Sequence, residues 1–234
     1  MVKISLDRVD FCLKESHDFS WLKKLGTVFT VYDQQDSGNL LFGVEENGTK
    51  YFVKYAGAQP LEYAGTSEDA VKRLVQATEI YETIQHENLT KYLYSKPCPD
   101  GLALIFEWFD GRCLHEHWNF ADCGKYQSGS PYKQYLDLPV DKKLLSVKTI
   151  FEFLEHVEQT GYVPVDFYDG SLMYDFESGT TKICDIDFFR KAPLVNDMGE
   201  DFWGSARFKA PEEYMKGAAI SSATTVFTLG AMLC

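Results

Sequence analysis

The sequence predicts an α+β fold, with a β-rich first half and a mainly helical second half. Short β-branched and aromatic runs separated by turn residues fill residues 28–55. One amphipathic helical pattern begins near residue 67, and a second, stronger one covers residues 144–157. A run of strands that carries one helix and is followed by a helical half is typical of α+β proteins with two layers of structure.

Three antiparallel strands are expected first, at Val28–Tyr32, Leu40–Val44 and Tyr51–Tyr55. The turn residues Asp36-Ser37-Gly38 and Glu46-Asn47-Gly48 separate them. Because both connections are short, the three strands are predicted to form a meander.

A helix is expected after this meander, with Ser67 as its N-cap and its end before His86. Its apolar residues fall at helical spacing and are Val71, Leu74, Val75, Tyr81 and Ile84. The near-continuous apolar run Leu102–Phe109 has the length of a strand and is closed by Asp110-Gly111. That dipeptide is the expected linker between two units, residues 1–109 and 110–234.

In the second half, residues 119–139 are rich in Gly, Ser, Tyr and Asp and are expected to form an irregular insertion. An amphipathic helix stopped by Gly161 and Pro164 follows it. Its apolar positions are Leu144, Val147, Ile150, Phe151, Leu154 and Val157. The stretch 217–234 has no charged residue but is short for a membrane span and contains several hydroxyl side chains, which favours a buried core helix.

Composition limits the partners. Lys and Arg number 23 against 35 Asp and Glu, so the formal net charge is −12. Such a charge repels nucleic acid and anionic membrane surfaces, and neither is expected as a partner. The N-terminal residues lack an apolar run of the kind found in secretory signals, so a cytoplasmic location is expected.

Three positions carry residue types that phosphoryl transfer needs: a cation for the phosphates, carboxylates for magnesium and a base for the hydroxyl. Lys54 lies in the third strand, where an ordinary solvated lysine is as good an explanation. Asp166 and Asp169 follow the second helix and a proline, and aspartates of this kind also form turns. Asp185 and Asp187 lie so close in sequence that they repel without a cation, which favours a metal site over a surface turn.

Four segments in order resemble the Lys, catalytic-loop Asp, metal-binding Asp and Ala-Pro-Glu landmarks of eukaryotic-type serine/threonine protein kinases. They are Phe52-Val53-Lys54, Val165–Ser171, Asp185–Asp187 and Ala210-Pro211-Glu212. The resemblance runs from about Thr27 to the C-terminus and is to a divergent branch, a bacterial one among the options. The catalytic loop is also similar to that of aminoglycoside phosphotransferases, which share the kinase-like fold.

The resemblance implies a bilobal fold, with residues 1–109 as a β-rich N-lobe and residues 110–234 as an incomplete, mainly helical C-lobe. It also implies ATP and Mg²⁺ as cofactors and the Ser or Thr hydroxyl of a protein as the acceptor. Asp166 would be the catalytic base, and its spacing to Ser171 matches the step to a metal-binding residue in that family. Asp185 would bind the metal with help from Asp187 or Ser171, leaving Asp169 as a loop residue.

Nucleotide contacts follow from the same resemblance. Phe106 would be the gatekeeper, residues 107–109 the hinge whose backbone bonds adenine, and Met173 the floor of the pocket. The implied nucleotide-binding residues are Lys54, Gly38, Leu40, Phe52, Phe106, Glu107, Phe109 and Met173.

Several positions depart from the family pattern. Gly38 is the single glycine left in the phosphate loop, Ala77 stands where the helix Glu would pair with Lys54, and Thr225 replaces an anchoring Asp. Such losses favour a pseudokinase, a scaffold that binds without catalysis, whereas the joint presence of Lys54, Asp166 and Asp185 opposes it. A small-molecule phosphotransferase is a third option, which an acidic residue at position 187 favours and the Ala-Pro-Glu segment opposes.

Overall fold

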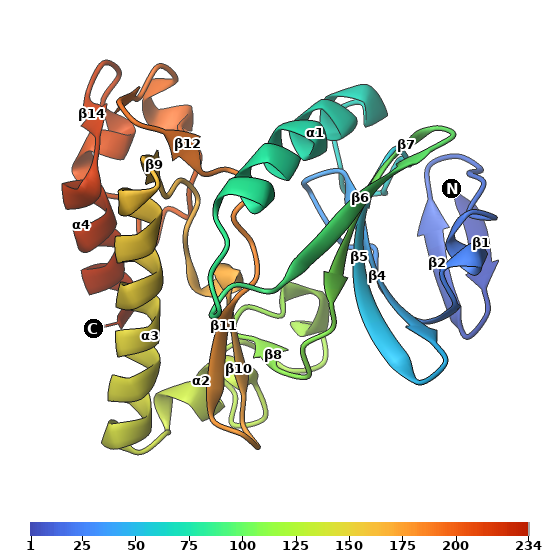
Figure 1. The fold of residues 1–234 in the computed structure, drawn as a ribbon, viewed down its shortest axis with the longest axis horizontal. Helices are drawn as coiled ribbons and strands as arrows, with labels where there is room; N and C mark the ends of the chain where they lie inside the picture. Colours follow the sequence, from blue (N-terminus) through green and yellow to red (C-terminus); the bar gives the residue numbers. More distant parts are fainter. Residues whose placement is uncertain (234) are drawn as a thin grey trace. The chain divides into compact units, whose positions relative to one another are not determined.

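The computed structural model describes residues 1–233, and position 234 lies outside the described residues. It confirms the predicted α+β class, with a multi-stranded antiparallel sheet and four α-helices in the described part (Figure 1). The chain divides into two compact units. The first contains Met1–Glu82 and Thr90–Phe109, and the second contains Thr83–Leu89 and the residues from Asp110 onward, so residues 83–89 group with the second unit.

A five-stranded antiparallel sheet forms the centre of the first unit, in the order β3-β4-β5-β7-β6. Its strands are β3 Thr27–Tyr32, β4 Asn39–Glu46, β5 Thr49–Ala56, β6 Tyr92–Cys98 and β7 Gly101–Glu107. The β4–β5 connection is the two-residue turn Asn47-Gly48, and both residues have positive φ, 52° and 82°. This geometry matches the twist of antiparallel strands and is favoured by Asn-Gly. The predicted meander is therefore present, with each strand slightly longer than expected.

Helix α1, Ser67–Thr83, packs in the first unit and differs from the prediction at two points. The hydroxyl of Thr66, not Ser67, accepts the amide N–H of Asp69 at 3.1 Å and caps the helix. Val75 is 54% exposed instead of buried. The buried residues of the helix are Ala70, Leu74, Ala77, Ile80 and Tyr81.

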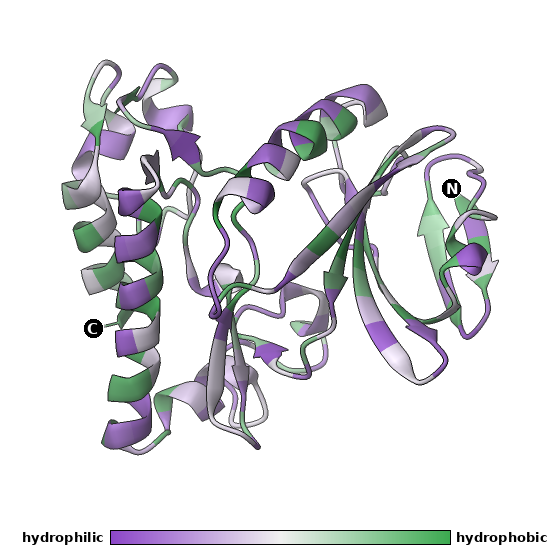
Figure 2. Cartoon of the chain, in the orientation of Figure 1, coloured by the Kyte–Doolittle hydropathy of each residue, from purple (hydrophilic) through white to green (hydrophobic). Residues whose placement is uncertain are grey.

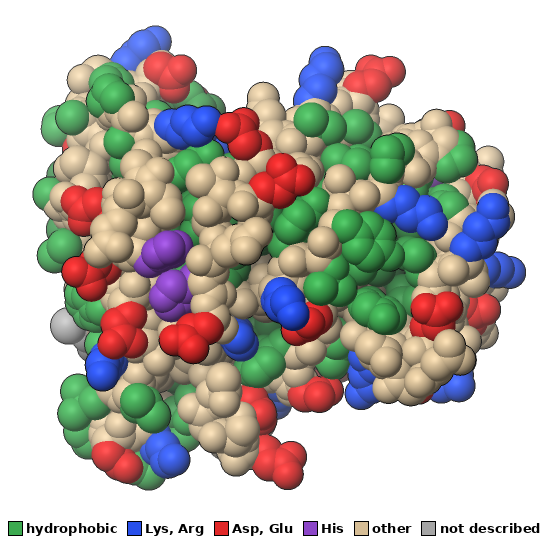
Figure 3. Space-filling view, viewed as in Figure 1, with side chains coloured by type: hydrophobic (Ala, Val, Ile, Leu, Met, Phe, Trp, Pro, Cys, Tyr) green, Lys and Arg blue, Asp and Glu red, His purple; other side chains and the backbone are tan. Residues whose placement is uncertain are grey.

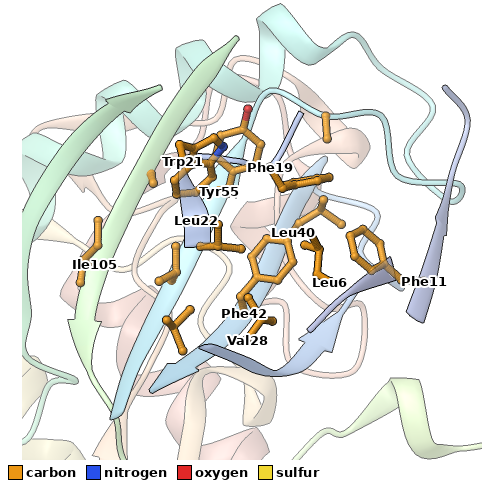
Figure 4. Close-up of a cluster of buried hydrophobic side chains, with 14 of the residues drawn as sticks. Leu6, Phe11, Phe19, Trp21, Leu22, Val28, Leu40, Phe42, Tyr55 and Ile105 are labelled. Carbon is orange, nitrogen blue, oxygen red and sulfur yellow. The ribbon is translucent and has the colours of Figure 1, made fainter. Parts of the chain in front are cut away.

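The hydrophobic core of the first unit lies on one face of its sheet (Figure 4). Because strand side chains alternate, β4 directs Leu40, Phe42 and Val44 to this face. A hairpin that the sequence did not predict covers them, made of β1 Val2–Leu6 and β2 Val9–Leu13. The rings of Phe11, Phe19 and Phe42 meet edge to face with centroids 5.6–5.9 Å apart, a preferred aromatic arrangement.

The second unit is built from helices and short strand pairs. Its helices are α2 Pro131–Leu136, α3 Val140–Gln159 and α4 Ser222–Leu233. Its strands are β8 Arg112–Cys113, β9 Tyr162–Val163, β10 Leu172–Asp175, β11 Thr180–Ile183, β12 Arg190–Lys191, β13 Leu194–Val195 and β14 Ala219–Ile220. They pair as a three-stranded sheet β11-β10-β8 and two ribbons, β12-β9 and β13-β14.

The insertion predicted to be irregular contains a capped helix. Ser130 accepts the amide N–H of Lys133 at 3.1 Å, and Pro131 occupies the first turn of α2, where its missing N–H costs nothing. The remainder of residues 119–139 forms turns around this helix. A short helix was missed because its apolar pattern spans less than two turns, while its cap residues resemble those of an ordinary loop.

Two faces predicted to be buried are exposed. In α3, Ile150, Leu154 and Val157 are buried, but Leu144 is 63% and Phe151 is 47% exposed. Figure 2 shows hydrophobic and hydrophilic bands alternating along this helix. The expectation of a buried core helix at 217–234 is wrong for most of its apolar residues, because α4 buries mainly Thr224, Thr228 and Leu229 and leaves Val226 63% exposed. Helices α3 and α4 together line a groove of about 450 Å³.

On the face drawn in Figure 3, basic and acidic side chains both occur, and several basic ones lie near one another at the right of the view. Acidic residues outnumber basic ones in the sequence, with a formal net charge of −12. No helix among residues 1–233 combines the length and apolar character needed to span a membrane.

We expect Phe42→Ala to destabilise the first unit by about 3–5 kcal/mol, because it removes a fully buried ring and leaves a cavity. Denaturant unfolding followed by fluorescence or circular dichroism measures this loss. Val75→Ala is the control and should change stability by less than about 0.5 kcal/mol, since Val75 is exposed. Equal effects of the two substitutions would contradict the core described above.

Candidate functional site

The face of the first unit's sheet opposite its core carries Phe52 and Lys54. In the strand register Lys54 lies between Leu41 and Leu104, while Phe52 lies between Gly43 and Phe106. Lys54 is only 4% exposed, and its Nζ lies 5.9 Å from the ring centroid of Tyr81 in α1. A buried ammonium is costly unless negative or π-electron groups compensate it, so the explanation of Lys54 as a solvated strand lysine is wrong.

Two predicted nucleotide contacts are packing residues in the structure. Leu40 is fully buried in the core shown in Figure 4, opposite the face of Lys54, and its side chain cannot line a pocket on that face. Phe106 is 1% exposed, and its ring packs against those of Tyr81, Tyr92 and Phe52 at centroid distances of 4.9, 5.7 and 6.0 Å. The core position of Leu40 corrects the prediction, whereas Phe106 is a buried wall of the same face as Lys54.

The turn that holds Gly38 is fixed to α1. Gly38 has φ +82°, and a Cβ at this position would lie 2.7 Å from the ring of Tyr63 and 2.9 Å from Cβ of Ala70. Arg73 donates from Nη2 to the carbonyl of Ser37 at 2.8 Å. Glycine is therefore required here by backbone conformation and close packing, which explains its presence independently of any phosphate.

The predicted hinge uses part of its backbone inside the sheet. The amide N–H of Glu107 donates to the carbonyl of Lys91 at 2.9 Å, and that of Trp108 donates to the carbonyl of Lys50 at 3.4 Å. The carboxylate of Glu107 pairs with the ammonium of Lys91 at 2.6 Å in an exposed position, where such a pair adds little stability. Phe109 is the last residue of the first unit.

In the second unit, Asp166 adopts a strained conformation. Its φ is +57°, in the left-handed region that few side chains other than Asn and Asp adopt. The neighbouring Phe167 is buried and packs 6.2 Å from the ring of Phe189, which holds the turn in place. Asp166 also lines a small cavity together with Gly204 and Ser205. Strain that the surrounding packing maintains is common at functional sites.

Tyr168, which the sequence did not single out, lies within electrostatic reach of two predicted carboxylates. Burial raises the pKa of Tyr168, and the negative charges of Asp185 and Asp166 raise it further. Its ring packs over Gly170, where a Cβ would come within 2.4 Å of a ring carbon. The structure therefore brings Asp166 and Asp185 into one electrostatic environment around a neutral phenol, and Gly170 makes room for that phenol.

Asp185 and Asp187 flank a buried anchor. Ile186 between them is 1% exposed, and the amide N–H of Asp187 donates to Oδ1 of Asp185 at 3.3 Å. Because alternate residues project to different sides, burial of Ile186 leaves both carboxylates partly exposed. The segment is tied to the loop of Asp166, since the amide N–H of Cys184 donates to the carbonyl of Ser171 at 3.0 Å.

The other two predicted residues have mainly structural contacts. Ser171 is 1% exposed, and its hydroxyl accepts the amide N–H of Tyr168 at 3.5 Å, which closes the turn. Met173 lies in β10, opposite Lys182 on one side and Cys113 on the other. Ser171 is thus committed to the shape of the loop, and a ligand role would use the hydroxyl's remaining lone pair.

The donor set suits a magnesium ion that is shared with a phosphate. Among residues 1–233, no group of three or more His, Cys, Asp or Glu side chains is arranged to hold a metal. Magnesium, however, is commonly bound by one or two carboxylates plus substrate phosphates and water. Asp185 and Asp187 provide such a pair, so these residues alone do not form a self-contained metal centre.

Asp169 is the centre of a buried ion cluster that the sequence did not predict. It is 1% exposed, and its carboxylate accepts hydrogen bonds from the ammonium of Lys125 and from the guanidinium of Arg207. Nδ1 of His115 lies 3.6 Å from Oδ1 of Asp169. Burial lowers the pKa of His115 to about 4, with the charges of Lys125 and Arg207 lowering it and that of Asp169 opposing them. The ring is therefore neutral near pH 7.

Hydrogen bonds fix the Ala210-Pro211-Glu212 segment to α4 and to the adjacent Glu213. Glu213 is buried and accepts the amide N–H of Ala210 at 2.7 Å, and this burial raises the pKa of Glu213. Thr224 donates to Glu212 at 2.6 Å, while Thr228 donates to the carbonyl of Phe208 at 3.2 Å. Thr224 and Thr228, one helical turn apart, hold this segment. The resemblance to kinases had instead indicated position 225, where Thr225 replaces an anchoring Asp.

We expect Gly170→Ala to destabilise the second unit by about 1–3 kcal/mol, because the new methyl group clashes with the ring of Tyr168. Thermal or denaturant unfolding measures the loss. Gly230→Ala is the matched control: Gly230 lies in α4 with open space around a Cβ, so the same substitution should stabilise by up to about 1 kcal/mol. Effects of the same sign would contradict the packing of Tyr168 over Gly170.

We also expect stability to fall as the pH is lowered from about 6.5 to 4, with His115 as one contributor. The pKa of His115 is lowered from an ordinary 6.5 to about 4 in the folded chain. In that window the unfolded chain therefore binds a proton that the folded chain does not, which favours unfolding. Urea unfolding at several pH values should show a shallower dependence in His115→Asn than in the natural sequence, and an unchanged dependence would refute this assignment.

No model of a known protein family matches the chain. The strongest grouping of chemically capable side chains is at the loop of Asp166 in the second unit, which is hydrogen-bonded to the segment of Asp185 and in which Asp169 is paired with two cations.

Proposed function

We propose that the chain is a protein-kinase-like phosphotransferase of the serine/threonine type, which transfers the γ-phosphoryl group of ATP to a protein hydroxyl. The observation that carries this proposal is the bond between the loop of Asp166 and the segment of Asp185, where the amide N–H of Cys184 donates to the carbonyl of Ser171, with Asp166 in a left-handed conformation. Phosphoryl transfer requires mainly positioning and charge neutralisation, and two differently placed carboxylates are suited to both tasks. In this proposal the two units correspond to the two lobes of a kinase-like fold.

Each carboxylate has a separate role in the proposed reaction. Asp166 orients the acceptor hydroxyl and accepts its proton as the new oxygen–phosphorus bond forms and the bond between the γ-phosphorus and the departing ADP breaks. Asp185, with Asp187 beside it, would hold Mg²⁺, which neutralises charge on the phosphate oxygens when bound. Lys54 supplies a cation for the phosphates, and its burial makes that charge more effective than it would be in water.

The first unit also supplies contacts for adenine in this proposal. Two amide N–H groups of the predicted hinge, those of Glu107 and Trp108, already donate to backbone carbonyls of the first unit. We therefore assign the donor to adenine to the backbone of Phe109. Phe52 and the wall formed by Phe106 lie on the same sheet face as Lys54, which supports nucleotide binding on that face.

A protein acceptor is favoured over a small molecule because the segment after Gly204 is held in a fixed conformation. Glu213, Thr224 and Thr228 hold residues 208–212 through side-chain bonds to Ala210, Glu212 and Phe208. A fixed stretch of chain beside the cavity lined by Asp166 is suited to present an extended peptide.

A nucleotide-binding scaffold without catalysis is the second candidate. Ala77 is fully buried in the face that α1 packs inward, so the position where the resemblance implies a glutamate is occupied by a methyl group. A protein with this arrangement would bind nucleotide without aligning it for transfer.

Transfer of labelled phosphate from Mg-ATP to generic protein substrates, measured beside ATP binding, tests the proposal. We expect Asp166→Asn to leave the Kd for Mg-ATP within a small factor but to lower kcat by about 10²–10⁴-fold, the usual contribution of a positioned base. Asp185→Asn should weaken magnesium-dependent binding and abolish transfer together. Lys54→Met, which keeps the length of the stem, should weaken productive binding.

Glu177→Gln, in the exposed turn after β10, is the control and should behave like the natural sequence. Retention of full transfer by Asp166→Asn would remove the base from its proposed role. Binding of ATP without transfer by the natural sequence would favour the scaffold instead.

A further inference from the structure

One buried carboxylate joins three segments that lie far apart in the sequence. Asp169 belongs to the loop of Asp166, Lys125 to the insertion and Arg207 to the segment before Ala210. The two cations are separated from Asp169 by 44 and 38 residues. A contact of this kind restrains long stretches of chain at once.

The geometry leaves Asp169 no role as a base. Arg207 donates from Nη2 to Oδ1 at 2.9 Å and from Nη1 to Oδ2 at 3.2 Å, a two-point contact that fixes the relative orientation of both groups. The ammonium of Lys125 also donates to Oδ2. Both oxygens are thus bound to cations, and the side chain is 2% exposed.

The insertion positions the ammonium of Lys125 against Asp169. Lys125 is 8% exposed, and its Nζ lies 4.1 Å from the ring centroid of Tyr132 and 5.9 Å from that of Tyr126. The hydroxyl of Ser130 donates to the carbonyl of Lys125 and also caps α2. Helix α2 and the lysine are therefore fixed by the same serine.

The partner of Arg207 lies close to the proposed base. Asp169 follows Asp166 by three residues, and Gly204 and Ser205, close to Arg207 in sequence, line the same small cavity as Asp166. The amide N–H groups of Phe208 and Lys209 both donate to the carbonyl of Ser205, at 2.8 and 3.1 Å. Fixing Arg207 therefore fixes this turn beside Asp166.

We propose that Asp169, held by Lys125 of the insertion, is a positioning residue that anchors residues 204–209 through Arg207 beside Asp166. Resting on the proposed function, this anchor sets the affinity for the protein acceptor and not that for ATP. It also assigns the insertion a task, which is to supply the second cation that pairs with the buried carboxylate of Asp169.

Hydrogen exchange followed by mass spectrometry tests the anchor without requiring catalysis. Arg207→Met is the main variant, because it leaves the ion pair of Lys125 and Asp169 in place. It also alters a side chain that is 36% exposed. We expect amide exchange at residues 205–209 to accelerate about tenfold or more, the scale expected for loss of a charge-assisted contact. Exchange in β4 and β5 should not change. Lys216→Met, an exposed change in the following turn, is the control.

Asp169→Asn and Lys125→Met should accelerate exchange in the same residues. Arg207→Lys should restore part of the protection, because it keeps the charge but loses the two-point geometry. The double variant Asp169→Asn with Arg207→Met should be no worse than the more severe single variant, since both remove one contact. Unchanged exchange at residues 205–209 in Arg207→Met would overturn the proposal.

Kinetics provide the readout that a merely structural role would not move. In Arg207→Met we expect the KM for a protein acceptor to rise about tenfold or more, with the KM for ATP within about twofold. Equal losses for both substrates would overturn the role in acceptor positioning. If the natural sequence transfers no phosphate while exchange responds as expected, the proposed function fails and the anchor stands.

Discussion

A buried carboxylate must be compensated, and in this protein that requirement organises the second unit. Asp169 is nearly inaccessible to water, so its charge is tolerated only because Lys125 and Arg207 supply donors at both oxygens. Burial lowers the pKa of the neighbouring His115, and the charges of Lys125 and Arg207 lower it further, so this ring is neutral near pH 7. An insertion, a loop and a distant segment are therefore bound to one side chain, and removing any of them leaves a buried charge without its partner.

The first unit depends on a different constraint, the two-residue alternation of a strand. In β4 and β5 one face carries Leu40, Phe42 and Tyr55 and is sealed by the β1–β2 hairpin. The other face carries Phe52 and Lys54 and is approached by Tyr81 of α1. The hydrophobic core thus occupies one face of the sheet and contains no charged residue. Lys54 is buried on the other face, against α1. This separation is why Leu40 and Lys54, both predicted to contact nucleotide, have different surroundings.

Local patterns predicted strands β3, β4, β5 and β7 and helices α1 and α3, because each of these is decided by residues within one turn or one strand. Patterns predicted burial wrongly where the packing of neighbouring elements decides which side of a helix is covered. Leu144 and Phe151 fit the apolar stripe of a helix, yet both lie on the exposed side of α3. The Asp169 cluster could not be predicted, since its members are separated by 38 and 44 residues and surface-type residues carry no signal of burial. A weak signal was present in the two aspartates three residues apart.

Those two aspartates show how position, and not residue type, divides chemical roles. Asp169 has both oxygens bound to cations and is withdrawn from solvent. Asp166, three residues earlier, has a left-handed backbone conformation, is partly exposed and lines a cavity. Carboxylates placed in contrasting environments are the usual means by which one site holds a reactive group and a fixed one. The strain at Asp166 and the charge pairing at Asp169 are then two parts of one arrangement, because the anchored residue holds the loop in which the strained residue is presented.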